Sequence, residues 1–565
     1  MSYVDAIYDK RNSTVRVIER RDGKRVTKDY PCEWSFYYDD PKGKYETIFR
    51  TPVSYYSTNS YKDYQLNLAM HKHKRLWESD INIVNKTLQK HYLGVQSPKL
   101  NICFFDIEVD FSPTLGFAPT DDPFNKVTAI SLYCTWLNDM ITLAIPPNSL
   151  SLDEATELVK DFPNTYLFDD EVEMFNTFFE IIDDADVMSG WNSEGYDVPY
   201  MVNRTARIMS NNDTRRFCLN NQLPKKREYE KYGKMQVTYD FSGRIHLDSL
   251  NLYQKYTYHE MHSYSLDTIA EYELKERKVQ YAGTLDQLYN EDFYKFIEYN
   301  RQDTMILKKL DDQLQFIDLA NEIAHDNTVL IPSAMGAVGV TDQALTNYAH
   351  SLGFVVPNKT KQKEDKKAAG AYVAFPKKGI HKYVGAIDIN SLYPSAIRAL
   401  NMSPETIVCQ MLPTYTEPFI QEQIKKHDKL EPFGGDVEKK KAKSFAAAWE
   451  GQFGSLEYQY VHQKDETKRI EIDWAVNAKK KNSTVHTADE AYDIVFHGGE
   501  KWMLSGNGTV FHYNFQGIVP GILEKWYAER QELQAKKKAA EVIDDSTIEV
   551  PNDIMSKLGK DLIDD

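Results

Sequence analysis

Acidic side chains beside apolar runs are the first feature of this sequence that could carry chemistry. In FFDIEVDF, Asp106 and Glu108 are two residues apart, so both project from the same face of a β-strand. The alternate positions are apolar and predict a buried face. Two neighbouring carboxylates raise each other's pKa, and a divalent cation bound between them relieves that cost. The segment fits such a metal site, and it equally fits a strand end that emerges into water.

Two further segments carry acids at spacings that suit the same chemistry. GWNSEGYDVPYMVNR places Asn192 and Asp197 around a glycine turn before a predicted helix, which Asp197 could simply cap. In YNRQD, Tyr299 and Asp303 are four residues apart and share one helix face, as an ordinary surface pair would. Each segment alone has such a simple explanation. The three together, in this order within one α/β region, indicate a composite acidic site.

These segments resemble the three exonuclease motifs of family B DNA polymerases, D-I-E, N-x-x-x-Y-D and Y-x-x-x-D, and in particular those of tailed-bacteriophage (myovirus) replicative polymerases. HLDSLNLYQKY and SYSLDTIA also resemble family segments between the second and third motifs. The resemblance implies two Mg2+ or Mn2+ ions roughly 3.5–4 Å apart that serve 3'-5' proofreading hydrolysis of a phosphodiester. Tyr299 would orient the attacking water, and Asn192 would contact the DNA strand. The implied metal ligands are Asp106, Glu108, Asp197 and Asp303.

A second segment, AIDINSLYPSAI, carries one aspartate into a turn and a predicted helix. It resembles motif A of the same family, D-x-x-S-L-Y-P-S-I-I; the ordinary alternative is a strand-turn-helix with a buried tyrosine. The resemblance implies that Asp388 binds both metals of a polymerase site and that the carbonyl of Ile389 binds one of them. Tyr393 would lie under the sugar, where its ring excludes a 2'-hydroxyl. Backbone amides at Ser391 and Leu392 would hold the triphosphate.

Two flanking segments extend the resemblance. AAGAYVAFP is similar to the family's Y-x-G-G/A segment, which implies that Gly370 and Tyr372 contact substrate DNA. GNGTVFHYNFQGIVPGILEKWYAER is similar to the lead into the first fingers helix, and Arg530 matches an arginine that contacts the incoming triphosphate. The family usually has a lysine four residues later, where this chain has Gln534, followed by Lys536 and Lys537. Which lysine contacts the triphosphate is therefore left open.

Two family motifs are absent from the sequence: motif B (K-x-x-x-N-S-x-Y-G) and motif C (D-T-D-S), which supplies the carboxylate partner of Asp388. We therefore expect the N-terminal component of a split polymerase, completed by a C-terminal chain that carries both motifs and a sliding-clamp contact. A break near the fingertip falls in an exposed loop, where a cut loses little packing. The alternatives are a truncated product, a stand-alone exonuclease with a relic polymerase site, and a non-enzymatic nucleic-acid-binding fragment.

The elements that must position these residues follow a mixed α/β and α+β multidomain pattern. Apolar periodicity predicts helices over 170–185, 291–314 and 519–541, a helical segment around 64–81 and a buried strand over 381–389. Residues 358–372 predict a charged linker, and the Lys-rich residues 410–505 predict an insertion of modest order with one strand pair near LEYQYVHQ and KRIEIDWAV. The predicted domains are an N-terminal domain at 1–99 with 332–372 returning to it, an RNase H-like exonuclease domain at 100–331, a partial palm at 373–510 and the first half of the fingers at 511–565.

Length and composition set the class of protein. The chain has 565 residues, 42% of them hydrophobic, which indicates several packed domains. Five scattered cysteines predict reduced thiols rather than a zinc site. The sequence shows no signal core or membrane span, so we expect a cytoplasmic protein of an infected bacterial host, without a membrane partner.

The net charge of -16 does not exclude a nucleic-acid partner, because binding depends on local basic grooves. Basic stretches interleaved with aromatic residues occur at 71–77 and 215–234. Such stretches suit sequence-tolerant binding of primer-template and single-stranded DNA, although charge runs are more often solvated faces. The expected ligands are therefore DNA, dNTP and Mg2+ or Mn2+, with two ions in each site.

Overall fold

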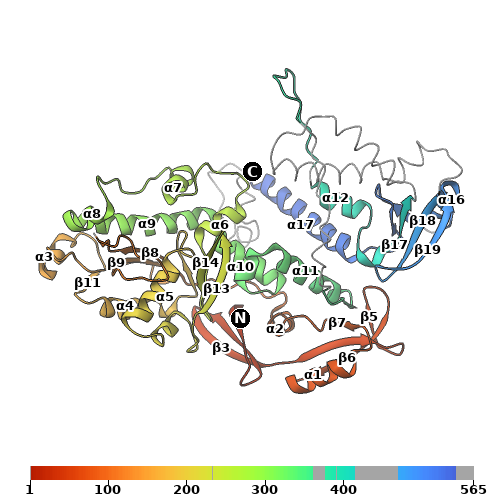
Figure 1. Ribbon diagram of the computed structural model, residues 1–565, viewed down its shortest axis with the longest axis horizontal. Helices are drawn as coiled ribbons and strands as arrows, with labels where there is room; N and C mark the ends of the chain where they lie inside the picture. The colour runs from red at the N-terminus through yellow and green to blue at the C-terminus, as the bar shows by residue number, and fades with distance from the viewer. Residues whose placement is uncertain are drawn as a thin grey trace.

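The computed structural model describes residues 2–112, 114–231, 233–359, 376–389, 391–413, 469–499 and 501–541. Within these ranges two lobes lie at the left and right of Figure 1, with N-terminal strands below and α10 (Phe316–Asn327) and α11 (Ala337–Ser351) between them. None of the helices in these ranges is long and apolar enough to cross a lipid bilayer. The five cysteines are buried free thiols.

Two sheets form the N-terminal region. The first is antiparallel, in the order β1-β2-β3, and the second has the order β16-β5-β6-β4-β7. Strand β16 of the second sheet comes from much later in the sequence than the others, and it pairs in parallel with β5. The bounds are β1 Ser2–Asp9, β2 Thr14–Arg21, β3 Lys24–Pro31, β4 Trp34–Asp39, β5 Tyr45–Thr47, β6 Pro52–Thr58, β7 Leu76–Trp77, β16 Phe354–Val355, α1 Tyr61–Met70 and α2 Ile83–Tyr92.

The helical segment predicted around 64–81 is shorter than expected. Helix α1 ends at Met70, and Trp77 instead belongs to β7, opposite Tyr37 of β4. The Trp77 ring is fully buried, and its Nε1 donates to Asp39 Oδ1 at 2.7 Å. Burial of this large aromatic ring in the sheet outweighs the local helical pattern.

The left lobe is built on a six-stranded sheet in the order β11-β10-β9-β8-β12-β15, with β8 inside it. The strands are β8 Ile102–Val109, β9 Val127–Cys134, β10 Asp139–Ala144, β11 Thr165–Leu167, β12 Val187–Ser189 and β15 Ile245–His246, and β13 Lys225–Lys231 pairs with β14 Lys234–Asp240 as a separate hairpin. The helices are α3 Leu152–Leu158, α4 Glu171–Ile181, α5 Asp197–Ile208, α6 Ser249–Tyr256, α7 Leu266–Leu274, α8 Leu285–Glu291 and α9 Phe293–Leu314, with short 3-10 turns η1 Ile182–Asp184 and η2 Asp213–Phe217.

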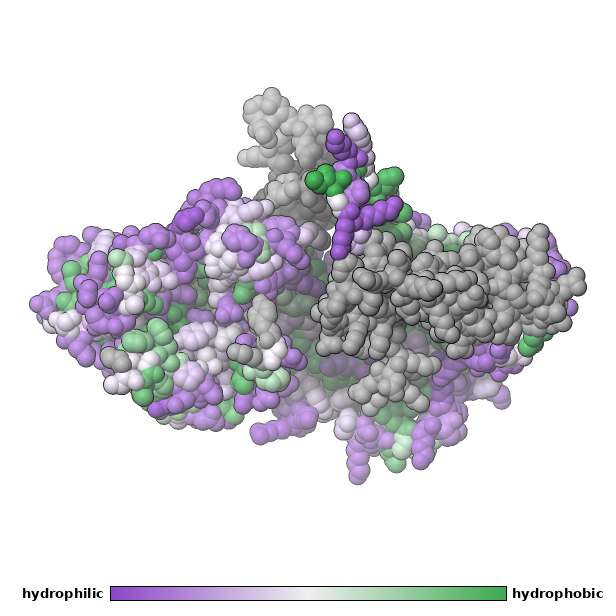
Figure 2. Space-filling view, turned by 45° about the horizontal axis from the view of Figure 1, so that its top comes forward, coloured by the Kyte–Doolittle hydropathy of each residue, from purple (hydrophilic) through white to green (hydrophobic). Residues whose placement is uncertain are grey.

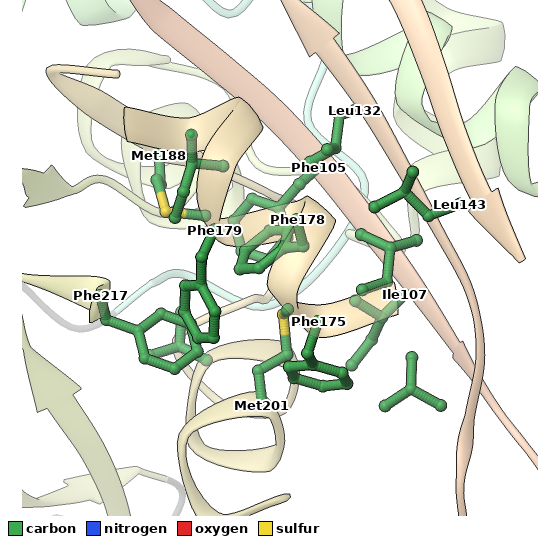
Figure 3. Close-up of a cluster of buried hydrophobic side chains, with 14 of the residues drawn as sticks. Phe105, Ile107, Leu132, Leu143, Phe175, Phe178, Phe179, Met188, Met201 and Phe217 are labelled. Atoms are coloured by element: carbon green, nitrogen blue, oxygen red, sulfur yellow. The ribbon is translucent and has the colours of Figure 1, made fainter. Parts of the chain in front are cut away.

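The side chains of strand β8 point alternately to the two faces of the sheet, as its sequence predicts. Phe105 and Ile107 enter a core with Phe175 and Phe178 of α4 (Figure 3). On the opposite face, Phe104 joins the core that includes residues of α9. The helices α4 and α9 confirm the helical predictions for 170–185 and 291–314, because their apolar periodicity packs against the two faces of one sheet.

The right lobe contains a five-stranded antiparallel sheet in the order β19-β18-β17-β21-β20. Its elements are β17 Ile407–Pro413, β18 Arg469–Val476, β19 Lys479–Thr487, β20 Trp502–Leu504, β21 Thr509–His512, α16 Ala488–Phe496, α12 Leu392–Ala399, α17 Ile518–Glu541 and the 3-10 turn η4 Pro404–Thr406. The 3-10 turn η3 Ile331–Met335 lies instead between α10 and α11, in the core that includes residues of α9. The modest order expected over 410–505 is thus wrong for 469–499, which form two of the five strands of this sheet and share its core. Residues 414–468, with LEYQYVHQ, and the predicted linker 360–372 lie outside the described residues.

Residues 381–389, predicted as a buried strand, form no strand and are exposed. This segment projects from the top of the right lobe in Figure 1, and Figure 2 shows it as a protrusion that mixes hydrophilic and hydrophobic residues. Ile387 is 96% exposed, and Tyr383 and Val384 are also exposed. The prediction assumed a neighbouring strand, and the described part of the chain pairs none with this segment.

Helix α17 confirms the helix predicted over 519–541, and polar groups from η4 and its flanks anchor its start. Asn401 Oδ1 accepts the Gly517 amide at 2.9 Å, and Glu405 Oε1 accepts the Ile518 amide at 2.5 Å. These bonds satisfy N–H groups that a helix start leaves without intrahelical partners. At Gly521 a Cβ would lie 2.7 Å from the Tyr348 hydroxyl, so α17 packs closely on α11.

A buried ion pair joins the N-terminal sheet to the left lobe. Arg20 of β2 donates to both oxygens of Asp186 at 2.7 and 2.9 Å, and their side chains are 3% and 0% exposed. Asp186 also accepts the Asn101 amide at 2.9 Å, one residue before β8. The start of the central strand is therefore tied to the N-terminal region.

We predict that Asp186→Ala lowers the free energy of unfolding by about 3–5 kcal/mol, because it leaves the Arg20 charge buried without its main partner. The matched control is Arg16→Ala, which removes the exposed Arg16–Asp29 pair and costs less than about 1 kcal/mol. Urea denaturation monitored by circular dichroism measures both. Equal losses for the two variants would contradict the structural role given to Asp186.

Candidate active site

Three of the predicted carboxylates meet where β8 lies under α9. Asp106, Glu108 and Asp303 each offer an oxygen within 4.8 Å of the others. Glu108 is 8% exposed and Asp303 2% exposed, so neither belongs to a strand or helix end that emerges into water. In the part of the chain that the structure describes, no other three acidic, histidine or cysteine side chains come together in this way.

Crowding and burial make these carboxyl groups hard to ionise together. Burial, and then the neighbouring charge of Glu108, raises the pKa of Asp106 well above its usual range. Burial, and then Asp303, raises the pKa of Glu108 to about 8. Burial also raises the pKa of Asp303. A cation placed among them would favour the ionised forms, as the divalent-metal hypothesis requires.

Lys278 supplies one cation at this site. Its Nζ donates to Asp303 Oδ2 at 2.5 Å and to the Tyr299 hydroxyl at 3.1 Å. Burial alone would lower the pKa of Lys278, but the charges of Asp303, Tyr299 and Asp106 raise it above its ordinary value. One lysine charge does not balance three carboxylates, so the site keeps a negative excess when all three are ionised.

The donor set fits a divalent ion. Asp303 Oδ1 is buried and has no hydrogen-bond partner among the described residues. Together with the oxygens of Asp106 and Glu108, it presents the hard carboxylate ligands that Mg2+ and Mn2+ take. These three residues could therefore hold a metal.

Asp197, the fourth predicted ligand, lies near this group but outside its 4.8 Å limit. It is the first residue of α5, and the preceding Tyr196 occupies the cap position, so Asp197 does not cap the helix. Burial raises its pKa to about 7, whereas the amides of Asp197 and Ile107 partly oppose that rise. Its electrostatic effect on Asp106 and Glu108 places it beside the same strand.

A cavity of about 370 Å³ opens beside the carboxylates. Asp106 and Lys278 lie at one side, and the rest of the wall is largely aromatic or aliphatic. Trp191 Nε1 donates to the Tyr264 carbonyl at 3.0 Å, which fixes the indole in this wall. The other lining residues are Asn192, Leu250, Tyr264, Ser265 and Leu266. Such a mixture of rings, apolar side chains and a few polar groups suits a nucleotide-sized ligand.

The sequence reasoning missed two residues of this site. Asn300 is fully buried, and its Nδ2 donates to Asp106 Oδ2 at 2.9 Å. Its position three residues before Asp303, on one helix face, could have revealed it. Lys278 lies in the loop between α7 and α8, and no local periodicity connects that loop to α9.

The predicted nucleotide-binding residues do not form a comparable cluster. Asp388 and Ile389 are exposed in the projecting segment, and Tyr393 is exposed near the start of α12. Ser391, with φ of 52°, precedes α12, and Leu392 begins it. Gly370 and Tyr372 lie outside the described residues.

Helix α12 nevertheless lies beside α17, which carries Arg530. Arg398 of α12 pairs with Glu524 at 3.4 Å, and its guanidinium lies 4.6 Å from the centre of the Tyr527 ring. Because Asn401 contacts the start of α17, positions earlier in α12 lie beside positions later in α17. Tyr393 and Arg530 therefore extend toward the same end of this helix pair.

Some residues of the two basic stretches, 71–77 and 215–234, contact other side chains of this protein. Lys74 lies 4.6 Å from the centre of the Tyr38 ring, and Arg75 lies 4.1 Å from that of Trp77. In the second stretch, Arg227 of β13 forms an ion pair with Asp240 at 2.9 Å and another with Glu194. Lys225 and Lys226 are exposed on β13. DNA binding by either stretch stays a prediction.

Comparison with known proteins places both segments in one family. The family model described as "DNA polymerase family B, exonuclease domain" matches residues 51–269, and that described as "DNA polymerase family B" matches residues 336–447. The two matched regions, 51–269 and 336–447, are thus both similar to DNA polymerase family B. Of the residues at the acidic site, Asp106, Glu108 and Asp197 fall within the exonuclease match.

Curated relatives of this chain include two phage polymerases. It is 30% identical over 257 residues to the DNA-directed DNA polymerase of Enterobacteria phage T4, covering 45% of this chain and 28% of that protein. It is 30% identical over 328 residues to that of Escherichia phage RB69, covering 55% and 36%. The DNA polymerase delta catalytic subunit of Drosophila melanogaster is 25% identical over 278 residues, 46% of this chain and 25% of that protein. The matches thus span about a third or less of these relatives.

The raised pKa values predict how metal binding and pH affect the stability of this chain. An acid whose pKa is higher in the folded state binds its proton more tightly when folded. Without metal, stability should therefore fall as pH rises from the ordinary Glu108 value of 4.5 to about 8. A divalent ion binds the ionised carboxylates, so Mg2+ should raise the melting temperature more at pH 8.5 than at pH 5.5.

Thermal unfolding with and without Mg2+ at the two pH values measures this effect. At a concentration of 100 times its Kd, bound metal adds about 2.7 kcal/mol. Glu108→Gln should abolish most of the metal-induced rise at pH 8.5, whereas Glu157→Gln, on the exposed face of α3, should leave it unchanged. A rise that is equal at both pH values and in both variants would contradict metal binding at this group.

Proposed function

We propose that this chain is the N-terminal component of a phage-type replicative family B DNA polymerase. In this proposal the left lobe removes 3'-terminal nucleotides from DNA as a two-metal proofreading exonuclease. The observation that carries the proposal is the buried group of Asp106, Glu108 and Asp303 beside a nucleotide-sized cavity. The family match over 51–269 supports the same activity.

Asp106, Glu108 and Asp303, with Asp197 beside them, would hold the metal ions. Bound Mg2+ or Mn2+ supplies a hydroxide nucleophile from water and stabilises the departing 3' oxygen. The aromatic wall of the cavity would hold the terminal base by stacking. Because Lys278 donates to the Tyr299 oxygen, the Tyr299 hydroxyl proton can point toward the attacking water or a phosphate oxygen.

The polymerase half of the proposal rests on α12, α17 and the projecting segment. In the described part of the chain, Asp388 belongs to no group of three or more acidic, histidine or cysteine side chains that could hold a metal. The exposed Tyr383, Val384 and Ile387 leave an apolar, unpaired segment, which is a common template for a strand from another chain. A C-terminal chain with motifs B and C would supply both the strand and the missing carboxylate.

In the assembled enzyme, Asp388 and the Ile389 carbonyl would bind two further metal ions. The amides of Ser391 and Leu392 would hold the triphosphate of a dNTP, and Tyr393 would exclude a 2'-hydroxyl. Arg530 would reach the same triphosphate, because it extends toward the same end of the helix pair. Primer-template DNA, and a sliding clamp through the second chain, would be the remaining partners.

The test uses this chain alone with Mg2+, a 5'-labelled primer-template and all four dNTPs. We expect progressive shortening of the primer without extension. Asp106→Ala and Asp303→Ala should each lower the cleavage rate by about a thousandfold or more, because each removes a member of one catalytic unit. DNA affinity, measured by fluorescence anisotropy in EDTA, should survive both substitutions.

Asp388→Ala is the matched control, since it removes a carboxylate from the other predicted site and should leave shortening unchanged. Absence of shortening by the unsubstituted chain would contradict the exonuclease proposal. Extension that disappears in Asp388→Ala would show that this chain already holds a second polymerase carboxylate, and would contradict the need for a partner chain.

A further inference from the structure

The loop between β12 and α5, residues 190–196, lies beside the acidic site. It carries Asn192, which lines the cavity, and it leads directly into Asp197. Asn192 has a φ of 58°, in the left-handed region that non-glycine residues seldom adopt. Regular secondary structure does not hold this loop, so other contacts must fix its position.

The carboxylate of Asp248 accepts hydrogen bonds from the backbone of this loop. Asp248, which is 5% exposed, accepts the Asn192 amide on Oδ1 at 3.1 Å and the Glu194 amide on Oδ2 at 2.9 Å. The same side chain caps α6, because Oδ1 also accepts the Leu250 amide at 2.9 Å. A charged acceptor suits this place, since converging N–H groups in a turn need a partner and bond a carboxylate strongly.

Neighbours of Asp248 hold the rest of the loop. The Ser249 amide donates to the Gly190 carbonyl at 3.0 Å, and His246 Nε2 lies 2.9 Å from the Ser193 hydroxyl. Asn251 Nδ2 donates to Glu194 Oε2 at 2.5 Å. Four residues of the segment 246–251 thus form hydrogen bonds with the loop, and Asp248 is the member that bonds two of its backbone amides.

The loop also touches the catalytic strand. A Cβ on Gly190 would lie 2.8 Å from the Phe105 carbonyl, so the loop backbone packs directly against β8 one residue before Asp106. At the other end of the loop, the Asp197 carboxyl group meets the Ile107 amide. A shift of the loop would therefore change the distance between Asp197 and the carboxylates of β8.

We propose that Asp248 is a positioning residue of the exonuclease site, which acts through the loop 190–196 to set the places of Asn192 and Asp197. This inference rests on the exonuclease function proposed above. The Asp248 side chain then has two tasks, capping α6 and holding the loop. Because a displacement of about 1 Å at reacting groups can cost about a hundredfold in rate, loss of the second task should be visible in cleavage.

Asp248→Ser separates these tasks, because serine is a good helix cap but is too short to hold both loop amides. Asp170→Ser is the matched control, because Asp170 caps α4 by accepting the Glu173 amide at 3.1 Å and lies outside the set of residues that hold the loop 190–196. Asp248→Asn is the conservative variant. It keeps Oδ1 but turns an N–H group toward the Glu194 amide.

The first measurement is the single-turnover cleavage rate of 5'-labelled single-stranded DNA at saturating enzyme. We expect a loss of about a hundredfold for Asp248→Ser, a smaller loss for Asp248→Asn and less than threefold for Asp170→Ser. Affinity for the same DNA in EDTA should fall less than tenfold in each. Losses for Asp248→Ser and Asp170→Ser that agree within threefold would overturn the proposal.

The second measurement is hydrogen-deuterium exchange of peptides covering 190–196, which needs no catalysis. Exchange in this loop should quicken in Asp248→Ser and Asp248→Asn and stay unchanged in Asp170→Ser. Unchanged exchange in all three variants would overturn the positioning role. If the unsubstituted chain cleaves no DNA while the loop still loosens in the Asp248 variants, the exonuclease function fails and the bracing by Asp248 stands.

Discussion

Mutual repulsion among buried carboxylates is the constraint on which the left lobe depends. Asp106, Glu108 and Asp303 oppose one another's ionisation, and burial adds to that cost. A fold keeps such a group only if the surrounding structure over-determines its place. Here two of the acids belong to a strand inside a six-stranded sheet, and the third belongs to a helix of 22 residues packed across it.

The apolar packing behind β8 supplies that rigidity. Residues on the odd face, such as Phe105, enter a dense aromatic core, and Phe104 enters the core beneath α9 on the other face. The strand cannot rotate about its axis without breaking the packing in one of these two cores. The ionised pair Arg20–Asp186 and the carboxylate of Asp248 then fix the start of β8 and the adjacent loop. Polar contacts thus place the elements that the cores make rigid.

Local sequence patterns predicted the helices and strands whose conformation depends mainly on residues close by in the sequence. The two-residue period of β8 and the periodicity of α4, α9 and α17 follow from which faces are apolar, so the sequence shows them directly. Asp106, Glu108 and Asp303 also came together as their segments predicted, since a strand face and a helix face each fix side-chain direction. The predicted extent of α1 was wrong because Trp77 pairs with β4, a strand that is distant in the sequence.

Contacts between distant segments escaped the sequence reasoning. Lys278 reaches Asp303 from a loop without periodicity, and Asp248 holds Asn192 from 56 residues away. The segment 381–389 also shows that the local sequence alone does not determine secondary structure. Its apolar residues favour a strand, but a strand forms only when a neighbour offers hydrogen bonds, and no such neighbour occurs among the described residues.

The two predicted sites therefore differ in a physical way. The acidic group at β8 has its carboxylates, its lysine and the loop 190–196 within one packed lobe, which holds the carboxylates together despite their mutual repulsion. Asp388 is exposed on a segment that has no strand partner among the described residues, and water solvates its charge at little cost. An isolated, solvated aspartate has no need of a metal, whereas a crowded, buried group does. This asymmetry supports the proposal that exonuclease chemistry belongs to this chain alone and that polymerase chemistry needs an assembly that buries Asp388 beside a second carboxylate.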